Sequence, residues 1–552
     1  MLTMLFKKPL HITLLTLLVF FACTEKPVLK IWESYDETAE IATNADHPIK
    51  RMHYKRLISK TADRNLLFKP FEKALTRFSD AQYETLKPFI LEQDIPTIQK
   101  HIASGNLSYE TLTLFYLYRM YRIELDRERY LNALISLNPS VLEEAKAKDV
   151  AFQKNPNQPP LFGMPILLKD NINTQGIATT AGAAAFANNI PEQDAFIVNK
   201  LKAAGALILG KVNMSEWAYY FCSGCPVGYS ALGGQTLNPY GRKKFESGGS
   251  SSGSGVAVAA NYAVAAIGSE TSGSILSPSG KNAVVGLKPT IGTLSRGGII
   301  PISETLDTAG PMTKFVIDNA LLFNAMLGQD TDDTYSFDRQ SIDIEALKNA
   351  SVAGRRVGYF ESYKEDSLYQ NALEQLKIAG ALLIPFDPPK INFSGFRTLL
   401  DVDMKKDLPN YINRYANPDL AFEDVASIIA FNAKDTLLYA PYGQALFEGI
   451  VADTTHVEDF KKLKKRLQEE AQRYFATAME ANDMEVVLSI NNYTAGYAAA
   501  AHYPALTVPM GFYPTGEPAN LTFIAPSKKE EILFEFAAAF EQMTHHRKPP
   551  NF

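Results

Sequence analysis

Two short turns rich in glycine and serine carry the residues best suited to covalent chemistry. The first turn runs from Gly248 to Gly253 and the second from Ser269 to Ser274, with small apolar residues between them. Glycine lets the backbone come close to another group, so several N–H donors can converge on one point. A serine hydroxyl beside such donors can attack an acyl carbon while the donors stabilise the developing oxyanion.

The attacking hydroxyl needs a base, and the best candidate is Lys169, which follows the apolar run from Pro165 to Leu168. A lysine side chain has an ordinary pKa near ~10.4 and must lose its proton before it can act as a base. Full burial can lower a lysine pKa by ~3–5 units, and the apolar run indicates such burial. Because successive side chains of a strand alternate, we expect the neighbouring Asp170 to face away from Lys169.

Several sequence blocks around these residues occur in a fixed order. GMPILLKDNI is followed by GGSSSGSG, by GSETSGSILSPS and by VVGLKPTIGTLSRGGIIPISETLDTAGPM. Together these blocks resemble the amidase signature family, and the last two are most similar to those of the peptide amidases, which remove ammonia from C-terminal peptide amides. The resemblance begins near Gly105, is strongest from Gly163 to Met312, and weakens between about 335 and 482.

The resemblance implies hydrolysis of a small or peptide-like amide to an acid and ammonia through an acyl-enzyme, without a cofactor or a metal. In the family the two catalytic serines lie 24 positions apart, the first directly after a Gly-Gly pair. That pattern assigns Ser274 as the nucleophile, Ser250 as the proton relay in a cis peptide, and Lys169 as the base. Ser251 and Ser252 are the nearest alternatives for the relay. The oxyanion hole is expected from the backbone N–H groups of the second turn, namely those of Thr271, Ser272, Gly273 and Ser274.

Helices and short apolar strands alternate along most of the chain. This pattern predicts an α/β fold of the amidase signature type, a mixed β-sheet core covered by helices on both faces. Strands are expected at 132–138, 165–168, 206–209, 265–268, 284–289, 357–360, 486–490 and 505–510. Helices are expected at 196–204, 215–221, 256–263 and 530–543.

The expected organisation has three parts. Residues 1–22 read as a lipoprotein-type signal peptide, 23–94 as a helical N-terminal extension, and 95–552 as the amidase signature domain. Within that domain, 335–482 is a variable and mostly helical region. The resemblance implies that this region covers the active site and shapes the substrate pocket.

The N-terminal residues have the pattern of an export signal. Lys7 and Lys8 precede an apolar run from Leu10 to Ala22 that ends at Cys23. This run is shorter than the ~20 residues that a membrane-spanning helix needs. Phe-Phe-Ala-Cys resembles a lipoprotein cleavage box, so we expect lipidation of Cys23, export to the periplasmic side and membrane contact only through that anchor. Thr24 favours the outer membrane by the same resemblance. Plain signal cleavage and an uncleaved anchor remain alternatives.

The charge balance argues against a nucleic-acid partner. The 552 residues carry a formal net charge of −5, whereas nucleic-acid-binding domains usually present a basic surface. The tightest basic cluster, Lys461 to Arg466, is surrounded by acidic residues and is typical of a solvated helix face. Besides Cys23, the only cysteines are Cys222 and Cys225, which can form a small disulfide loop or stay free, but cannot alone complete a zinc site.

Three other functions compete with an active amidase. Gly249 to Gly253 formally matches the G-x-S-x-G elbow of α/β-hydrolases, but a polar segment precedes it and no histidine stands in a recognisable partner segment. A surface-tethered binding protein with a silent amidase scaffold is a second alternative. An amidotransferase subunit that handles aminoacyl-tRNA is a third, although export and the acidic charge speak against a tRNA partner.

Overall fold

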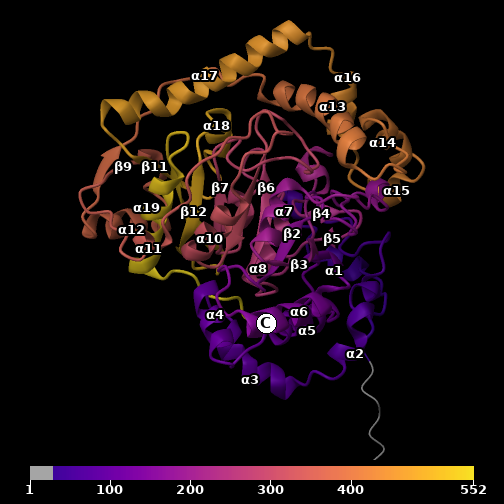
Figure 1. Ribbon diagram of the computed structural model, residues 1–552. Helices are drawn as coiled ribbons and strands as arrows, with labels where there is room; N and C mark the ends of the chain where they lie inside the picture. Colours follow the sequence, from indigo (N-terminus) through magenta and orange to yellow (C-terminus); the bar gives the residue numbers. More distant parts are fainter. Residues whose placement is uncertain (1–28) are drawn as a thin grey trace, which may run out of the picture.

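An 11-stranded mixed β-sheet forms the centre of the molecule, whose computed structural model describes residues 29–552 (Figure 1). This sheet, covered by helices, confirms the predicted fold class. In spatial order its strands are β1 (Leu134–Leu137), β3 (Leu207–Val212), β2 (Pro165–Lys169), β6 (Ala265–Glu270), β8 (Thr308–Thr313), β7 (Val285–Lys288), β12 (Ala505–Phe512), β13 (Pro518–Ile524), β11 (Val486–Ile490), β9 (Arg356–Tyr359) and β10 (Leu382–Pro385). A separate hairpin pairs β4 (Tyr229–Ser230) with β5 (Gly234–Gln235).

The strands that carry the predicted base lie in the middle of this sheet. Strand β2 pairs in parallel with β3 on one side and with β6 on the other, and β6 pairs antiparallel with β8. Every residue of β2, β3 and β6 is buried. Near-continuous apolar runs form such strands because both sheet faces are covered. The end of β2 therefore delivers Lys169 into an interior that excludes water.

Helices cover both faces of the sheet. Helices α8 (Ser252–Ala259) and α9 (Leu276–Lys281) pack against each other, α8 lying on β6 and α9 on β12. Helices α10 (Val316–Met326) and α19 (Glu530–Thr544) pack against each other from the other face, on β8 and β12 respectively. The remaining helices of the core are α4 (Ile95–Ala103), α5 (Tyr109–Glu124), α6 (Val141–Lys154), α7 (Phe196–Ala203), α11 (Ile344–Leu347), α12 (Ser367–Ile378) and α18 (Ala495–Ala500).

Helix α8 starts at Ser252, four residues before the predicted start. Its first turn, Ser252-Gly253-Ser254-Gly255, is fully buried and packs directly against backbone. A Cβ added to Gly253 would lie only 2.4 Å from the carbonyl oxygen of Asn213. Glycine is therefore required where this helix approaches the end of β3, and that close approach fixes the loop that precedes α8.

The segment 215–221 is not the helix that the sequence predicts. It forms only a short 3₁₀ turn, Glu216–Tyr219, in which Trp217, Ala218 and Tyr219 have φ values of 50°, 55° and 72°. The backbone is held by partners outside the segment, since the Ser215 N–H donates to the Ser250 carbonyl at 3.0 Å and the Trp217 N–H donates to the Ala181 carbonyl at 3.0 Å. These tertiary hydrogen bonds override the local helix preference.

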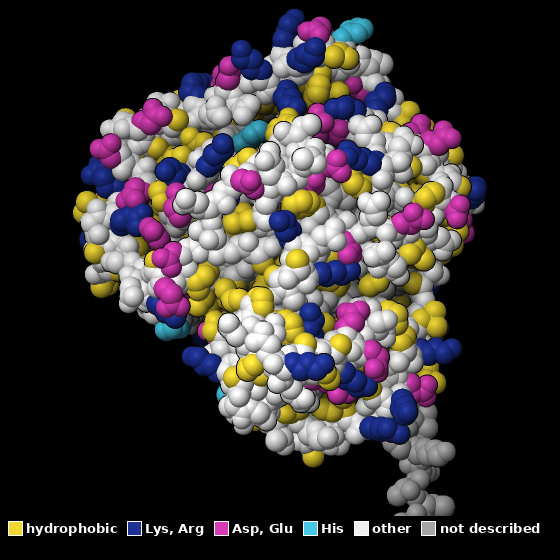
Figure 2. Space-filling model, viewed as in Figure 1, with side chains coloured by type: hydrophobic (Ala, Val, Ile, Leu, Met, Phe, Trp, Pro, Cys, Tyr) yellow, Lys and Arg dark blue, Asp and Glu magenta, His cyan; other side chains and the backbone are white. Residues whose placement is uncertain are grey.

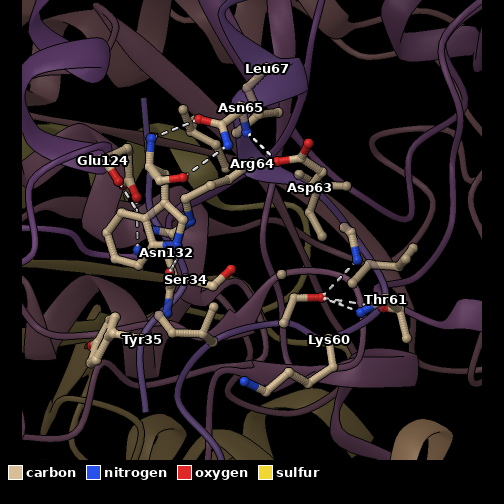
Figure 3. A pocket seen from close by; sticks show the side chains of 18 residues that line it. Ser34, Tyr35, Lys60, Thr61, Asp63, Arg64, Asn65, Leu67, Glu124 and Asn132 are labelled. Atoms are coloured by element: carbon tan, nitrogen blue, oxygen red, sulfur yellow. Dashed lines mark hydrogen bonds between the residues drawn. The ribbon is translucent and has the colours of Figure 1, made fainter. Parts of the chain in front are cut away.

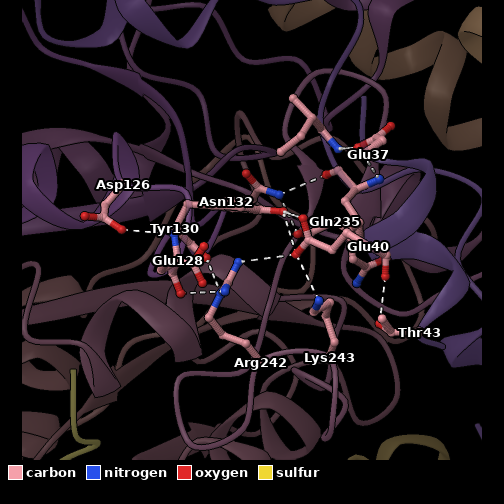
Figure 4. A network of polar contacts seen from close by, with 12 residues as sticks. Glu37, Glu40, Thr43, Asp126, Glu128, Tyr130, Asn132, Gln235, Arg242 and Lys243 are labelled. Atoms are coloured by element: carbon pink, nitrogen blue, oxygen red, sulfur yellow. Dashed lines mark hydrogen bonds and ion pairs between the residues drawn. The ribbon is translucent and has the colours of Figure 1, made fainter. Parts of the chain in front are cut away.

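Residues 29–94 form an irregular extension rather than a uniformly helical one. Their helices are α1 (Thr38–Ala42), α2 (Glu72–Leu75) and α3 (Asp80–Ile90), joined by loops and short 3₁₀ turns. Trp32, Leu57 and Phe68 belong to the same hydrophobic core as α5. A polar network also joins the extension to the core, with Glu40 placed 3.1 Å from Lys243 and close to Tyr130 (Figure 4).

The extension and the core enclose a cavity of about 440 Å³. Arg64 lies on its wall, donates to the Glu124 carbonyl at 2.9 Å and reaches Asn132 (Figure 3). The guanidinium stacks on the ring of Trp32 at 4.1 Å from the ring centroid. Arg64 therefore ties the extension to the end of α5 and to the segment before β1.

A helical cap arches over one edge of the sheet (Figure 1). It consists of α13 (Phe396–Tyr415), α14 (Val425–Asn432), α15 (Thr436–Tyr439), α16 (Ala445–Ala452) and α17 (Val457–Ala481), all of which lie within residues 335–482. The cap contacts the loop after β2, since Tyr411 donates to Asn173 Oδ1 at 2.7 Å and the Asn173 amide donates to the Tyr415 carbonyl at 2.9 Å.

The charged surface matches the sequence-based expectation. Blue and magenta side chains are interspersed over the face in Figure 2. On α17, Lys461 pairs with Glu458 at 2.8 Å and Lys465 with Glu469 at 3.7 Å, which confirms a solvated helix face. Among residues 29–552, no helix is both long and apolar enough to cross a bilayer. The predicted signal peptide at 1–22 and the predicted lipidation site at Cys23 lie outside the described residues.

Candidate active site

Lys169 ends β2 with a fully buried side chain. Its Nζ lies 2.8 Å from Ser250 Oγ, 2.9 Å from Ser269 Oγ and 3.0 Å from the Ser269 carbonyl oxygen. The structure thus brings the predicted base into direct contact with the predicted relay hydroxyl.

Burial lowers the pKa of Lys169 to about 7, although the carboxylates of Asp307 and Glu270 oppose the shift. An amine with this pKa is largely uncharged just above neutral pH, where it can accept a proton. The amine therefore has the protonation behaviour that a general base requires.

Asp170 faces away from Lys169, as the alternation along a strand predicts. Its carboxylate accepts hydrogen bonds from the hydroxyl of Thr180 and from the N–H of Gly182, the latter at 3.2 Å. Its other oxygen lies 3.9 Å from Nζ of Lys211, a second buried lysine on β3. The negative charge of Asp170 is thus directed at Lys211 and leaves the base unpaired.

Ser250 lies in the loop before α8, and the Gly249–Ser250 peptide bond is cis, as the family resemblance implies. The Ser250 side chain is fully buried. The two alternative relays are used elsewhere, because Ser251 Oγ donates to the Ser269 carbonyl at 3.1 Å and Ser252 Oγ donates to the Gly248 carbonyl at 2.6 Å. Of the three hydroxyls in this run, only that of Ser250 contacts Lys169.

Ser274 lies in the turn between β6 and α9, next to the relay loop. Its carbonyl accepts the N–H of Ser251 at 3.0 Å, which ties the two turns together. Ser274 is 9% exposed, whereas Ser250, Ser251 and Ser252 are all at 0%. It is therefore the most accessible of these hydroxyls. Gly273, which precedes it, has φ of 86°, a backbone conformation that a residue with a Cβ rarely adopts.

Glu270 shapes the nucleophile turn, a role that sequence reasoning missed. Its carboxylate accepts the N–H groups of Gly273 at 2.7 Å, Ile275 at 2.7 Å and Leu276 at 3.0 Å. The Gly273 N–H is therefore engaged, unlike the free donor expected for an oxyanion hole. The N–H groups of Thr271, Ser272 and Ser274 have no acceptor within residues 29–552 and remain available.

Two further residues hold the base in place. Ser269 Oγ contacts Nζ of Lys169 and also accepts from the amide of Asn171 at 2.9 Å. Asn171 follows Lys169 by two residues, and Ser269 opens the second Gly/Ser turn. Their positions beside the motif residues were visible in the sequence, but their contact with the amine depends on the pairing of β2 with β6.

A cavity of about 460 Å³ lies between the 296–307 segment and helix α13 of the cap. It is lined by residues from 296–307, from 332–334 and from the α13 segment 407–415. Asp307 on its wall accepts the Thr271 hydroxyl at 2.5 Å, which links the cavity to the turn that carries Ser274. The size fits a small ligand or a few residues of a peptide.

Two other kinds of functional site that the described residues could form are a metal site and a reactive cysteine. No group of three or more His, Cys, Asp or Glu residues suited to a metal ion occurs in the described part of the chain. Cys222 and Cys225 form a disulfide, which decides between the two alternatives left open by the sequence.

Comparison with known proteins gives consistent matches along the chain. The family model described as Amidase matches residues 116–534. A probable amidase of Arabidopsis thaliana is 33% identical over 439 residues, which cover 76% of this chain and 85% of the relative. An amidase family protein from Bacillus anthracis has a solved structure with TM-score 0.84 and 35% identity, covering 90% of this chain and 100% of that one. The peptide amidase of Stenotrophomonas maltophilia matches with TM-score 0.78 and 36% identity, covering 84% and 99% respectively.

Proposed function

The chain belongs to the amidase family and is an amide-hydrolysing enzyme, and from this premise we propose that it cleaves peptide-like carboxamides by a Ser274–Ser250–Lys169 relay. The observation that carries the proposal is the contact of 2.8 Å between a fully buried lysine amine and the Ser250 hydroxyl. An uncharged amine in that contact can withdraw a proton from the hydroxyl chain.

The acylation step moves two protons and forms one bond. Ser274 Oγ attacks the amide carbon as its proton passes to Ser250 Oγ, and the Ser250 proton passes to Nζ of Lys169. The carbonyl oxygen becomes an oxyanion facing the free N–H groups of the nucleophile turn. Each such donor can contribute ~2.7–4 kcal/mol to the transition state.

Collapse of this intermediate releases ammonia. The protonated Lys169 returns a proton through Ser250 to the departing nitrogen, the C–N bond breaks, and the acyl group stays on Ser274. Water then attacks the ester by the same proton route, and the acid leaves with the serine restored. The contact of Lys169 with Ser250, and the backbone hydrogen bond between Ser251 and Ser274, support this proton route.

Likeness to a peptide amidase supports a peptide-like substrate. The cavity beside the turn also has tyrosine side chains on its cap side, at Tyr411 and Tyr415. Aromatic walls suit extended, partly apolar chains. We infer that the acyl part of a C-terminally amidated peptide lies in this cavity.

The test is ammonia release from a library of amidated peptides, small amides and glutamine, with the wild type and Ser274→Ala. We expect turnover of peptide amides and its loss in the variant. Ser277→Ala is the matched control, because Ser277 is a partly exposed serine one turn away whose hydroxyl makes no hydrogen bond within residues 29–552. Equal activity of Ser274→Ala and wild type would contradict the assignment. A strict need for companion subunits and charged tRNA would favour the amidotransferase alternative.

We also propose export with a lipid anchor at Cys23, supported by the apolar run and the Phe-Phe-Ala-Cys box. Metabolic labelling with a fatty-acid analogue is the test. Label and membrane association are expected in the wild type and not in Cys23→Ala. Unlabelled, freely soluble wild-type protein would contradict the anchor.

A further inference from the structure

The cavity beside the nucleophile turn carries more carboxylates than its cations neutralise. In two ion pairs on its wall the charges neutralise each other. Arg296 binds Asp333 at 2.9 Å through Nε, and Arg414 pairs with Asp332. Four other carboxylates in and behind the wall have no place in these pairs, those of Glu304, Asp307, Asp403 and Asp407. They come from the 303–307 loop and from helix α13.

Asp403 and Asp407 lie one turn apart on the buried side of α13. They are 1% and 7% exposed. Asp407 accepts the N–H of Glu304 at 2.6 Å, and Asp403 accepts the hydroxyl of Ser303. Oδ1 of Asp403 is buried without any hydrogen-bond partner among the described residues. Like charges at this helical spacing repel each other, and the repulsion is stronger inside a protein than at its surface.

The available cations compensate this cluster only partly. Lys406 binds Glu304 at 2.8 Å but lies 3.9 Å from Asp407, and its side chain is 56% exposed. Lys464 lies 3.9 Å from Glu304 and donates to Tyr335 at 2.8 Å. Burial, with Asp403 and Glu304 nearby, raises the pKa of Asp407 to about 8. At neutral pH this carboxyl group is therefore mostly protonated, and a cation that enters the cavity would favour its ionised form.

The position of the cluster suggests what that cation is. If ammonia is the leaving group, the acyl part carries all of the structure that the enzyme can recognise. Asp307 joins the cavity to the nucleophile turn through Thr271, and it also accepts the N–H groups of Ile302 at 2.8 Å and Ser303 at 2.9 Å. The loop that follows Ser303 brings Glu304 to Asp407. These carboxylates therefore line the cavity in which we infer that the acyl part of a bound amide lies.

We propose that this cavity selects amides whose acyl part carries a cationic group, the ammonium or guanidinium of a basic residue, bound by the carboxylates of Asp407 and Glu304. Asp403 lies behind them and adds negative charge through the Ser303 loop. This inference rests on the proposed function, because it assigns a substrate class to the same site.

The experiment uses matched amidated dipeptides that contain lysine or norleucine, at the amidated residue or at the residue before it. Norleucine keeps the length of the lysine side chain and removes the charge. We expect kcat/KM of the wild type for one lysine peptide to exceed that of its norleucine partner by about tenfold or more, the range of a hydrogen bond to a charged group. In Asp407→Asn that ratio should fall to about threefold or less.

Two more variants keep the test decisive. Glu304→Gln changes a partly exposed side chain and should lower the ratio in the same direction even if Asp407→Asn folds poorly. Asp459→Asn removes one carboxylate from the solvent face of α17, 67% exposed, and should leave the ratio at the wild-type value. Equal wild-type rates on lysine and norleucine peptides would overturn the inference and leave the proposed function standing. Absence of ammonia release from every peptide would overturn both.

Discussion

Two buried lysines on neighbouring strands show what makes one of them suitable as a base. Lys169 on β2 and Lys211 on β3 are both fully buried, and burial lowers their pKa values to about 7 and about 8. Their partners differ. Lys169 contacts the hydroxyls of Ser250 and Ser269, whereas Lys211 lies 3.9 Å from the carboxylate of Asp170 and donates to Thr179 at 2.8 Å.

The comparison shows that a lowered pKa alone does not identify a catalytic lysine. Lys211 and Asp170 compensate each other and link two strands, and Nζ of Lys211 contacts neither Ser250 nor Ser269. Lys169 has no carboxylate within ion-pair distance among the described residues. It instead contacts the hydroxyl of Ser250, which the proposed mechanism uses as the proton relay to Ser274. Lys211 is therefore structural and Lys169 is the base in the proposed mechanism.

The largest effect is expected from Lys169→Met. Removal of the base should lower kcat/KM by about 10³–10⁴-fold, as for other general bases that act within a catalytic unit. The buried amine is also costly, since a pKa lowered from 10.5 to about 7 corresponds to roughly 4–5 kcal/mol. Thermal unfolding should therefore show an unchanged or higher Tm. A lower Tm together with retained activity would reverse the roles of the two lysines.

Lys211→Met should have the opposite signature. Loss of its amine leaves the buried Asp170 carboxylate without its cation, which we expect to destabilise the fold by about 3–5 kcal/mol. Activity per folded molecule should stay within about tenfold of the wild type. Denaturant unfolding checks the stability, and the double variant Asp170→Asn with Lys211→Met is the control that should recover part of it. Full stability with lost turnover would contradict the structural role.

Ser250→Ala tests the hydroxyl that distinguishes the two lysine sites. Without it the amine of Lys169 has no proton path to Ser274, and a decrease of about 10²–10³-fold in kcat is expected. Ser251→Ala is the control at the neighbouring position, with a smaller expected effect because its hydroxyl contacts only the Ser269 backbone. Steady-state ammonia release measures kcat of both variants. A larger decrease in kcat for Ser251→Ala than for Ser250→Ala would assign the relay role to Ser251.

The pH profile gives the smallest but most specific effect. A base with pKa about 7 is neutral above that value, so kcat/KM should rise with pH, level off above about pH 8, and fall about tenfold per pH unit well below 7. The midpoint of this acidic limb of the pH profile should be the same in Lys211→Met as in the wild type. A limb that shifts with Lys211, or a flat profile between pH 5 and 8, would assign the titration to another group.

The burial of Lys169, the two turns and the α/β fold could be predicted because their signals are local. An apolar run before Lys169 predicts its burial, and the glycines around Ser250 and Ser274 mark turns where backbone donors converge. The pairing of the strands could not be predicted in the same way, because strands far apart in the chain are neighbours in the sheet, as β7 and β12 are. Strand β8, with a Gly-Pro pair in its centre, and β13 were not predicted, because their residues become strands only by pairing with β6 and β12.

The remaining details depend on contacts between distant residues. Segment 215–221 has a helix-like composition, yet hydrogen bonds to Ala181 and Ser250 give it another conformation. The Gly273 N–H looked free in the sequence but is bound by Glu270. Asp407 is more than 130 residues from the nucleophile turn in sequence, and only the placement of α13 over the sheet brings it to the cavity. Such long-range placement leaves no local pattern.

The most direct test of the relay is the rate at which a fluorophosphonate labels the protein as a function of pH, with peptide mapping of the labelled residue. We expect label on Ser274, a rate that falls below pH about 7 with the ionisation of Lys169, and almost no labelling in Lys169→Met. Label on another residue, or a rate at Ser274 that neither pH nor Lys169→Met changes, would contradict the proposed mechanism.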